Sequence, residues 1–159
     1  MQPIEPQKEH RWLTQLVGDW TFENEAVMGP DQPPVKFKGT DSVRSLGDVW
    51  VLCEGQGEMP GGGVGTMIMT LGFDPAKQRF VGTFIGSMMT NLWVYEGQLN
   101  GNVLTLDTLG PSFTDPNKLT KYQDIIEILD ADHRTLSSQA LGDDGQWVRF
   151  MTARYTRKK

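Results

Sequence analysis

The sequence contains few of the residues that form disulfide frameworks and metal centres. Its 159 residues include one cysteine and two histidines. A single cysteine cannot form a disulfide within the chain, so stability has to come from packing. One thiol and two distant imidazoles also lack the spacing of zinc ligands. We therefore expect no metal and no cofactor, and the scarcity of cysteine favours a reducing, cytoplasmic location.

Positive charge and long apolar runs are also scarce. Fifteen Lys and Arg against twenty Asp and Glu give a formal charge of −5 at pH 7. This sign disfavours nucleic-acid and acidic-membrane partners, because no excess of cations exists to neutralise phosphates. No apolar run approaches the roughly 18 residues of a membrane-spanning helix. The first residues, 1–6, lack the basic and apolar regions of a secretory signal, so we expect none.

Glycine, in contrast, is abundant, with 18 residues. Turn sequences such as Gly47-Asp48, Asp74-Pro75 and Asn100-Gly101 separate short segments rich in Val, Ile, Thr and aromatic residues. These segments are typical of β-strands. Repeats, low-complexity tracts and a dividing linker are all absent from the sequence, so we predict a single domain over residues 1–159.

One segment has a helical pattern. Its apolar residues Trp12, Leu13, Leu16 and Val17 recur at the helical period, so we predict a helix over about residues 6–17. About ten strands are expected to follow, at residues 19–28, 35–46, 49–57, 64–73, 79–87, 92–99, 103–109, 121–129, 134–141 and 146–156.

The short connections between these strands indicate an antiparallel meander. A helix of this size is too small to cover so wide a sheet, and closing the sheet on itself removes its exposed edges. The sequence therefore predicts an all-β fold. We expect a closed antiparallel up-and-down barrel of about ten strands, spanning about residues 19–156, with one N-terminal capping helix.

Particular sequence motifs resemble those of known barrels. Gly18-Asp19-Trp20 is similar to the start of the first strand in lipocalin-like (calycin) barrels, where the Trp packs into the closed end. With Gly72-Phe73-Asp74-Pro75 and the segments 80–88, 92–97 and 153–158, the chain resembles a bacterial family of lipocalin-like barrels described as a domain of unknown function. The resemblance covers nearly the whole chain. It implies the fold, and it implies no activity.

A more distant resemblance is to nitrobindin-like barrels, which have ten strands and hold haem. This resemblance implies a proximal histidine deep inside the barrel. His10 lies on the predicted helix and His133 lies in the turn at residues 130–134, and neither is in the middle of a strand. We therefore expect no haem.

Alternation along the strands predicts which side chains face the interior. If Trp20 points inward, so do Phe22, Asn24, Ala26 and Met28. The sixth strand allows either Trp93 or Val94 inside, and the face of the last strand that carries Arg149 stays open. The predicted interior is mostly apolar with a few charges. The residues predicted to contact a ligand there are Phe37, Asp41, Met67, Met69, Trp93, Tyr122, Asp124 and Arg149.

Apolar walls with a few convergent polar groups are typical of small-molecule sites. The first hypothesis is therefore an uncharacterised lipocalin-like protein that binds a small apolar or amphipathic molecule. A second is an isomerase- or cyclase-like enzyme, in which an inward carboxylate is the base and Tyr122 or Arg149 polarises a carbonyl. Alternatively, Asp124 and Arg149 form an internal pair and no ligand exists.

The predicted strands at 79–87 and 92–99 are apolar on both faces, which a free monomeric barrel does not need. This pattern favours a homodimer formed by the region 80–95, and in a third hypothesis the barrel is only the scaffold of that dimer.

Other candidate motifs favour structural roles. The glycines at 61–65 precede a strand and lack the Lys of a phosphate-binding loop. Cys53 lies inside a predicted strand beside Glu54, an acid that would raise the pKa of the thiol, so we expect it to be buried and inert.

Overall fold

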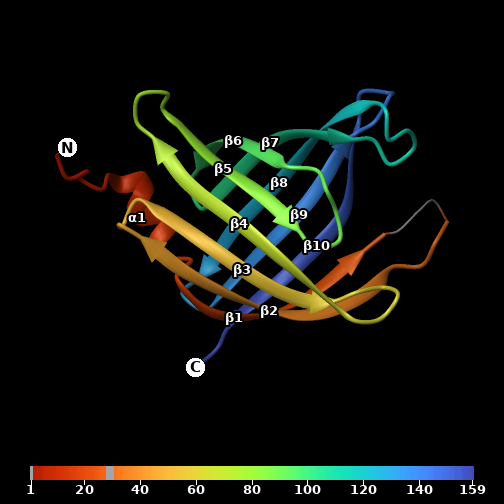
Figure 1. Cartoon of the computed structure of the whole chain (residues 1–159), viewed down its shortest axis with the longest axis horizontal. Coiled ribbons are helices and arrows are strands. Elements are labelled where there is room, and N and C mark those ends of the chain that lie inside the picture. Colours follow the sequence, from red (N-terminus) through yellow and green to blue (C-terminus); the bar gives the residue numbers. More distant parts are fainter. Residues whose placement is uncertain (1, 28–30) are drawn as a thin grey trace.

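One helix and ten strands make up the regular structure of the computed structural model, which describes residues 2–27 and 31–159 (Figure 1). Within these ranges the helix is too short and too polar to cross a membrane. The elements are α1 (Lys8–Thr14), β1 (Gly18–Ala26), β2 (Val35–Leu46), β3 (Trp50–Glu58), β4 (Val64–Asp74), β5 (Arg79–Gly86), β6 (Trp93–Asn100), β7 (Val103–Pro111), β8 (Leu119–Asp130), β9 (His133–Leu141) and β10 (Trp147–Arg157).

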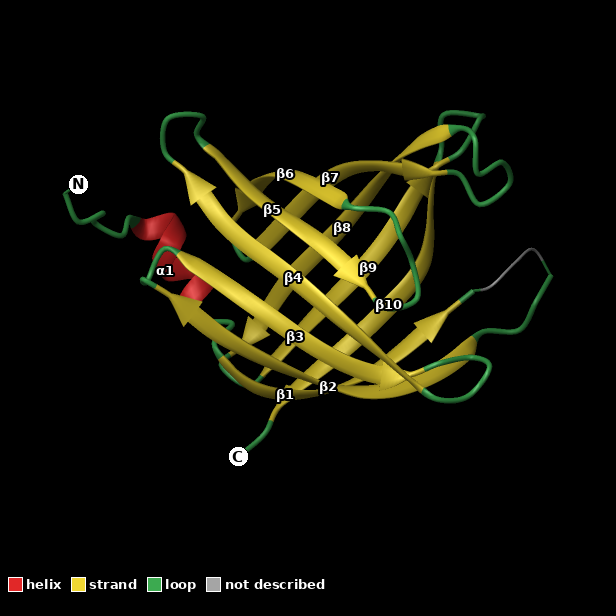
Figure 2. Ribbon diagram, in the orientation of Figure 1, coloured by secondary structure: helices red, strands yellow, loops and turns green. Residues whose placement is uncertain are grey.

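The strands form a closed barrel in which each strand pairs antiparallel with its sequence neighbours (Figure 2). Closure is completed by β1, which pairs with β10 from Trp20 opposite Arg157 to Ala26 opposite Met151. The predicted all-β, closed, ten-stranded barrel with one N-terminal helix is confirmed. The strand predicted at 19–28 ends at Ala26, and Met28 lies outside the described residues.

The helix is shorter than the predicted range of 6–17. After Thr14 the chain continues in tighter turns, in which the amides of Gln15, Leu16 and Val17 donate to the carbonyls three residues earlier. Such bonds satisfy the last carbonyls of a helix without extending it. The turn brings Leu16 into the core, where it is 1% exposed.

Helix α1 and the longer loops lie at opposite ends of the barrel (Figure 1). The helix packs its apolar side on the barrel, with the Trp12 ring 6.3 Å from the Phe80 ring. His10 joins helix and sheet, because its Nδ1 accepts from the Gln7 amide and its Nε2 lies 3.0 Å from the Phe73 carbonyl. One end of the barrel is therefore closed, and the loops form a mouth at the other end.

Room inside the barrel depends on glycines at inward positions. A Cβ at Gly39 would lie 2.3 Å from both the Phe22 ring and the Gln56 carbonyl oxygen, so the ring rests directly on the backbone of β2. On β3, Gly55 and Gly57 also face inward and lie under the Met67 methyl group. Because these positions carry no side chains, the barrel keeps interior space beside β2 and β3.

Candidate functional site

A cavity of about 460 Å³ extends from the closed end of the barrel to its mouth. Its lining comes from the barrel strands, from Leu16 after the helix and from loop residues at the mouth. All six methionines of the described residues line it, and the remaining lining is mainly aromatic or aliphatic. These methionines are Met59, Met67, Met69, Met88, Met89 and Met151. Flexible thioether side chains can repack around guests of different shapes.

Aromatic rings form a connected cluster near the mouth. Trp93 and Tyr122 meet edge to face with centroids 5.1 Å apart, and Phe113 from the β7–β8 loop lies 5.7 Å from Tyr122. The Phe113 ring is also 5.0 Å from that of Phe150 on β10. Because Phe113 itself is 73% exposed, this cluster joins the cavity wall to the rim.

Asp124 is the main polar group on the cavity wall. It lies on the inward face of β8, and its oxygens accept hydrogen bonds from the Tyr95 hydroxyl and, at 2.5 Å, from Ser138 Oγ. Burial raises the pKa of Asp124 above its usual value, and these two donors oppose the rise. Among the described residues, no cation lies within ion-pair distance of this carboxyl group.

A buried ion pair lies deeper in the cavity. Arg134 Nη2 donates to Asp41 Oδ2 at 2.8 Å, and the two side chains are only 4% and 9% exposed. The guanidinium carbon is 3.9 Å from the centre of the Tyr155 ring and 4.6 Å from that of Trp20. Burial raises the pKa of Asp41, although Arg134 opposes this rise. Arg134 thus stabilises the ionised form of Asp41 against the effect of burial.

Two other titratable groups next to this pair are held in their neutral forms. Burial raises the pKa of the Cys53 thiol to about 12, with a further contribution from Asp41. Burial also raises the pKa of Tyr155 well above its usual value. Cys53 is 8% exposed, so the expected buried, inert thiol agrees with its position in the structure.

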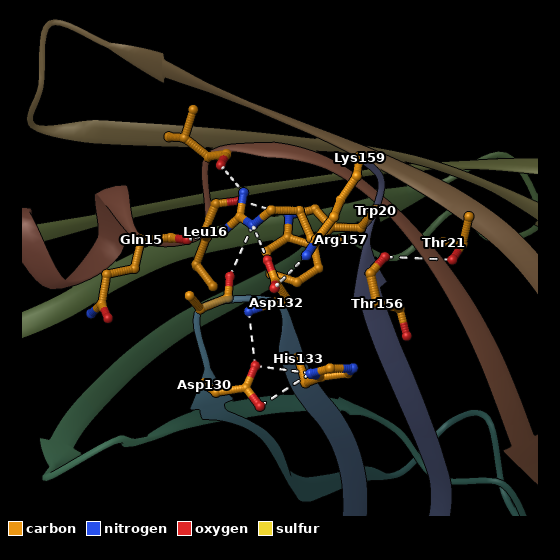
Figure 3. A network of polar contacts seen from close by, with 12 residues as sticks. Gln15, Leu16, Trp20, Thr21, Asp130, Asp132, His133, Thr156, Arg157 and Lys159 are labelled. Carbon is orange, nitrogen blue, oxygen red and sulfur yellow. Dashed lines mark hydrogen bonds and ion pairs between the residues drawn. The ribbon is translucent and has the colours of Figure 1, made fainter.

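Below the cavity, Trp20 and Arg157 close the end of the barrel (Figure 3). Trp20 is 2% exposed, and its indole N–H donates to the Leu16 carbonyl at 2.8 Å. The Arg157 guanidinium lies 4.2 Å from the Trp20 ring centre and donates to the carbonyls of Gln15, Val17 and Ala131. Because each nitrogen of this guanidinium donates a hydrogen bond to a backbone carbonyl, Arg157 has a structural role.

The structure places seven of the eight predicted site residues along the cavity. Trp93 faces inward, and its neighbour Val94 is 58% exposed on the outer wall. The residues lining the cavity are Phe37, Asp41, Met67, Met69, Trp93, Tyr122 and Asp124. Their role as ligand contacts stays a prediction.

The prediction for Arg149 is wrong. Its side chain is exposed and does not line the cavity, so it cannot pair with Asp124. The cause is a β-bulge in β10, where the pairing with β9 shifts between Arg149 and Met151. A bulge inserts one residue and reverses the alternation beyond it. Met151, Ala153 and Tyr155 therefore line the cavity, although the side chain of Arg149 faces solvent.

Sequence reasoning missed three polar residues of the site. Arg134 has the only buried guanidinium among the described residues, whereas Tyr95 and Ser138 bind Asp124. Alternation back from Ser138 would have placed Arg134 on the inward face of β9. The register of distant strands decides which side chains meet across the barrel. The sequence pattern of a single strand does not reveal that register.

The two histidines lie outside the cavity lining. His10 packs between α1 and β4, and His133 is exposed with its Nδ1 2.9 Å from Asp130 Oδ1. Within residues 2–27 and 31–159, no three His, Cys, Asp or Glu side chains are grouped as metal ligands would be.

Comparisons with known proteins agree with this barrel. Among solved structures, Rv2717c from M. tuberculosis matches with a TM-score of 0.66 and 15% identity, covering 98% of this chain and 100% of that chain. Two designed barrels also match. EF1p2_mFAP2b bound to DFHBI has a TM-score of 0.52 and 14% identity over 94% of this chain and 98% of its own. The redesigned barrel mFAP1 bound to DFHBI has a TM-score of 0.51 and 15% identity over 92% of this chain and 99% of its own.

Identities this low establish a shared fold and no shared function. A search of curated proteins finds no match. Residues 5–157 match the family described as "Protein of unknown function (DUF1579)". Because this match spans nearly the whole chain, the protein belongs to the DUF1579 family.

Proposed function

We propose that the barrel cavity binds a small apolar or amphipathic molecule. The observation that carries this proposal is the cavity of about 460 Å³, lined by methionines and aromatic rings and reaching the mouth. Sites for small molecules have volumes of about 300–1,000 Å³ and mostly apolar walls with a few polar groups. The designed barrels bound to DFHBI support the proposal, since a barrel of this fold can hold a bound molecule.

The enzyme hypothesis has weaker support. Asp124 has the raised pKa and the cavity position that a general base needs. The two residues predicted to polarise a substrate carbonyl, Tyr122 and Arg149, are not available for this role beside Asp124. Arg149 faces solvent, and the Tyr122 hydroxyl already donates to the Pro111 carbonyl at 2.5 Å. The geometry therefore favours binding over proton transfer.

Filling the cavity tests the binding function. Met67 faces the interior, and Met67→Trp is expected to weaken binding of the neutral apolar dye Nile red by about tenfold or more, because the larger side chain occupies the cavity. Fluorescence titration measures this affinity. Leu129→Trp is the control, since Leu129 is 56% exposed and lies outside the cavity lining, so the variant should bind the dye as the wild type does.

Native mass spectrometry of the purified wild-type protein provides a second test. A small molecule that remains bound supports the function directly, and the Met67→Trp variant should then retain less of it. The binding function is wrong if the wild type carries no small molecule and also fails to bind Nile red.

We also propose that the protein forms a homodimer through the outer faces of β5 and β6. Val94 is 58% exposed, and it lies opposite Thr83 on β5. Ile85, 46% exposed, pairs with Ile68 on the other side of β5. These side chains form a strip on the outer wall in which Thr83 is the one polar residue, and an interface between two copies would cover this strip.

Light scattering after size exclusion tests the dimer. The wild type at micromolar concentration is expected to have twice the 17.8 kDa of one chain. Val94→Lys is expected to yield the monomer, because a buried interface excludes an unpaired charge. Leu46→Lys, at an exposed position outside the strip, should remain dimeric. A monomeric wild type would contradict the proposal. The cytoplasmic location stays a prediction that the single free cysteine supports.

A further inference from the structure

Among the residues that the structure describes, the Asp124 carboxylate has hydrogen-bond donors but lacks a counterion. Tyr95 on β6 and Ser138 on β9 each donate to one of its oxygens. Burial raises the pKa of Asp124, and the two donated bonds oppose this rise, but both donors are neutral hydroxyls. A carboxylate has about four acceptor positions, so positions remain for further N–H donors. Asp124 lines the cavity, and a ligand in the cavity can reach these positions.

Over residues 2–27 and 31–159, the rest of the cavity has no free cation for an anionic ligand. Three carboxylates line it, at Asp41, Glu58 and Asp124, together with one guanidinium, at Arg134. Arg134 is already paired with Asp41. No lysine or histidine of the described chain lines the cavity. A ligand carboxylate would therefore lose its hydration and find only like charge, which is costly in an apolar site.

Aromatic rings lie next to Asp124 on the side of the mouth. Tyr122 precedes Asp124 by two residues on the inward face of β8. Trp93 likewise precedes Tyr95, the donor to Asp124, by two residues on β6. Phe113, at the rim, contacts Tyr122. The faces of such rings attract organic cations. A cationic group that moves inward from the mouth passes this cluster before it reaches the carboxylate.

We propose that the ligand is an apolar amine, whose ammonium group pairs with Asp124 while its apolar part packs among the methionines. This inference rests on the proposed binding function. The ammonium group would donate to the free acceptor positions of Asp124 and supply the missing counterion. The wide, methionine-rich remainder of the cavity accepts apolar groups of different shapes.

Three probes of equal chain length test this inference. Dodecylamine, dodecanol and dodecanoate are titrated into the protein by calorimetry at neutral pH, each below its solubility limit or micellar concentration. The wild type is expected to bind dodecylamine about tenfold or more tightly than dodecanol, and dodecanoate most weakly. Asp124→Asn keeps the size of the side chain and removes its charge. This variant is expected to lose the preference for the amine and to bind dodecanol within about twofold of the wild type.

A matched control separates this site from the overall negative charge. Glu127→Gln removes an exposed carboxylate of β8 that lies outside the cavity lining. This variant should keep the preference for dodecylamine. Loss of the preference in Glu127→Gln but not in Asp124→Asn would overturn the assignment to Asp124. If Asp124→Asn does not fold, the order of the three affinities in the wild type decides.

The outcomes distinguish the two proposals. Wild-type protein that binds none of the three probes and no Nile red contradicts the binding function itself. Equal affinity for dodecylamine and dodecanol, or tighter binding of dodecanoate, leaves the binding function intact and overturns the amine inference.

Discussion

Replacing Arg134 with methionine is expected to lower the free energy of unfolding by about 3–5 kcal/mol. The reason is that Asp41, only 8% exposed, would remain buried without the guanidinium 2.8 Å away. The same change removes the cation that lies between the rings of Trp20 and Tyr155. Urea denaturation at pH 7 measures the loss.

The double variant Asp41→Leu/Arg134→Met is the informative control. Replacing both members of a buried pair with apolar side chains of similar size is often neutral or stabilising. The double variant is therefore expected to be far more stable than Arg134→Met alone. If the stability losses of Asp41→Leu and Arg134→Met simply add in the double variant, the two residues are not coupled. The proposed role of Arg134 in stabilising the buried Asp41 is then wrong.

The stability loss of Arg134→Met should also depend on pH. Burial raises the pKa of Asp41 above its unfolded value of 3.8, and without Arg134 the folded-state pKa rises further. A carboxyl group whose folded pKa is raised stabilises the fold below its unfolded pKa and loses that contribution as the pH rises through the folded pKa. The difference between the variant and the wild type should therefore shrink as the pH falls from 7 toward 4.

Trp20→Ala is expected to reduce the free energy of unfolding by a similar amount, about 3–5 kcal/mol. Trp20 is 2% exposed, and the guanidinium carbons of Arg134 and Arg157 lie 4.6 Å and 4.2 Å from its ring centre. Figure 3 shows Arg157 beside Trp20 at the closed end. Its removal leaves a cavity and deprives the Leu16 carbonyl of the indole N–H. Chemical denaturation monitored by circular dichroism measures the effect.

Two further variants keep this prediction testable if Trp20→Ala does not fold. Trp20→Phe preserves an aromatic ring and removes the indole hydrogen bond, so it should cost about 1–3 kcal/mol. Trp147 is 39% exposed at the start of β10, and Trp147→Ala should cost less than about 1 kcal/mol. Equal losses for the two alanine variants would show that the closed end contributes no special stability.

Much of the fold follows from patterns within short segments. The strand predicted at 35–46 coincides with β2, and the other described strand ends differ from their predicted positions by at most two residues. With Trp20 taken as inward, alternation correctly placed Phe22, Met69 and Asp124 inside. These predictions succeed because a pleated strand alternates its side chains with a period of two, whatever it pairs with.

The helix and the last strand are the places where local pattern was insufficient. The apolar residues after Thr14 continue the helical spacing, but tighter turns carry Leu16 into the core. In β10 the bulge between Arg149 and Met151 changes the phase of the alternation, which the apolar residues on both faces did not reveal. A bulge forms where two paired strands differ in length locally, so it depends on the partner strand as much as on its own sequence.

The identities of interior polar partners depended entirely on the closed barrel. Asp41 and Arg134 are separated by 93 residues, and Tyr95 and Asp124 by 29. Residue types and alternation were enough to expect an apolar interior with a few inward carboxylates. The tertiary structure alone decided that Arg134 neutralises Asp41 and that Asp124 has no cation within the described part of the chain, because interior contacts are set by strand register and by closure between β1 and β10.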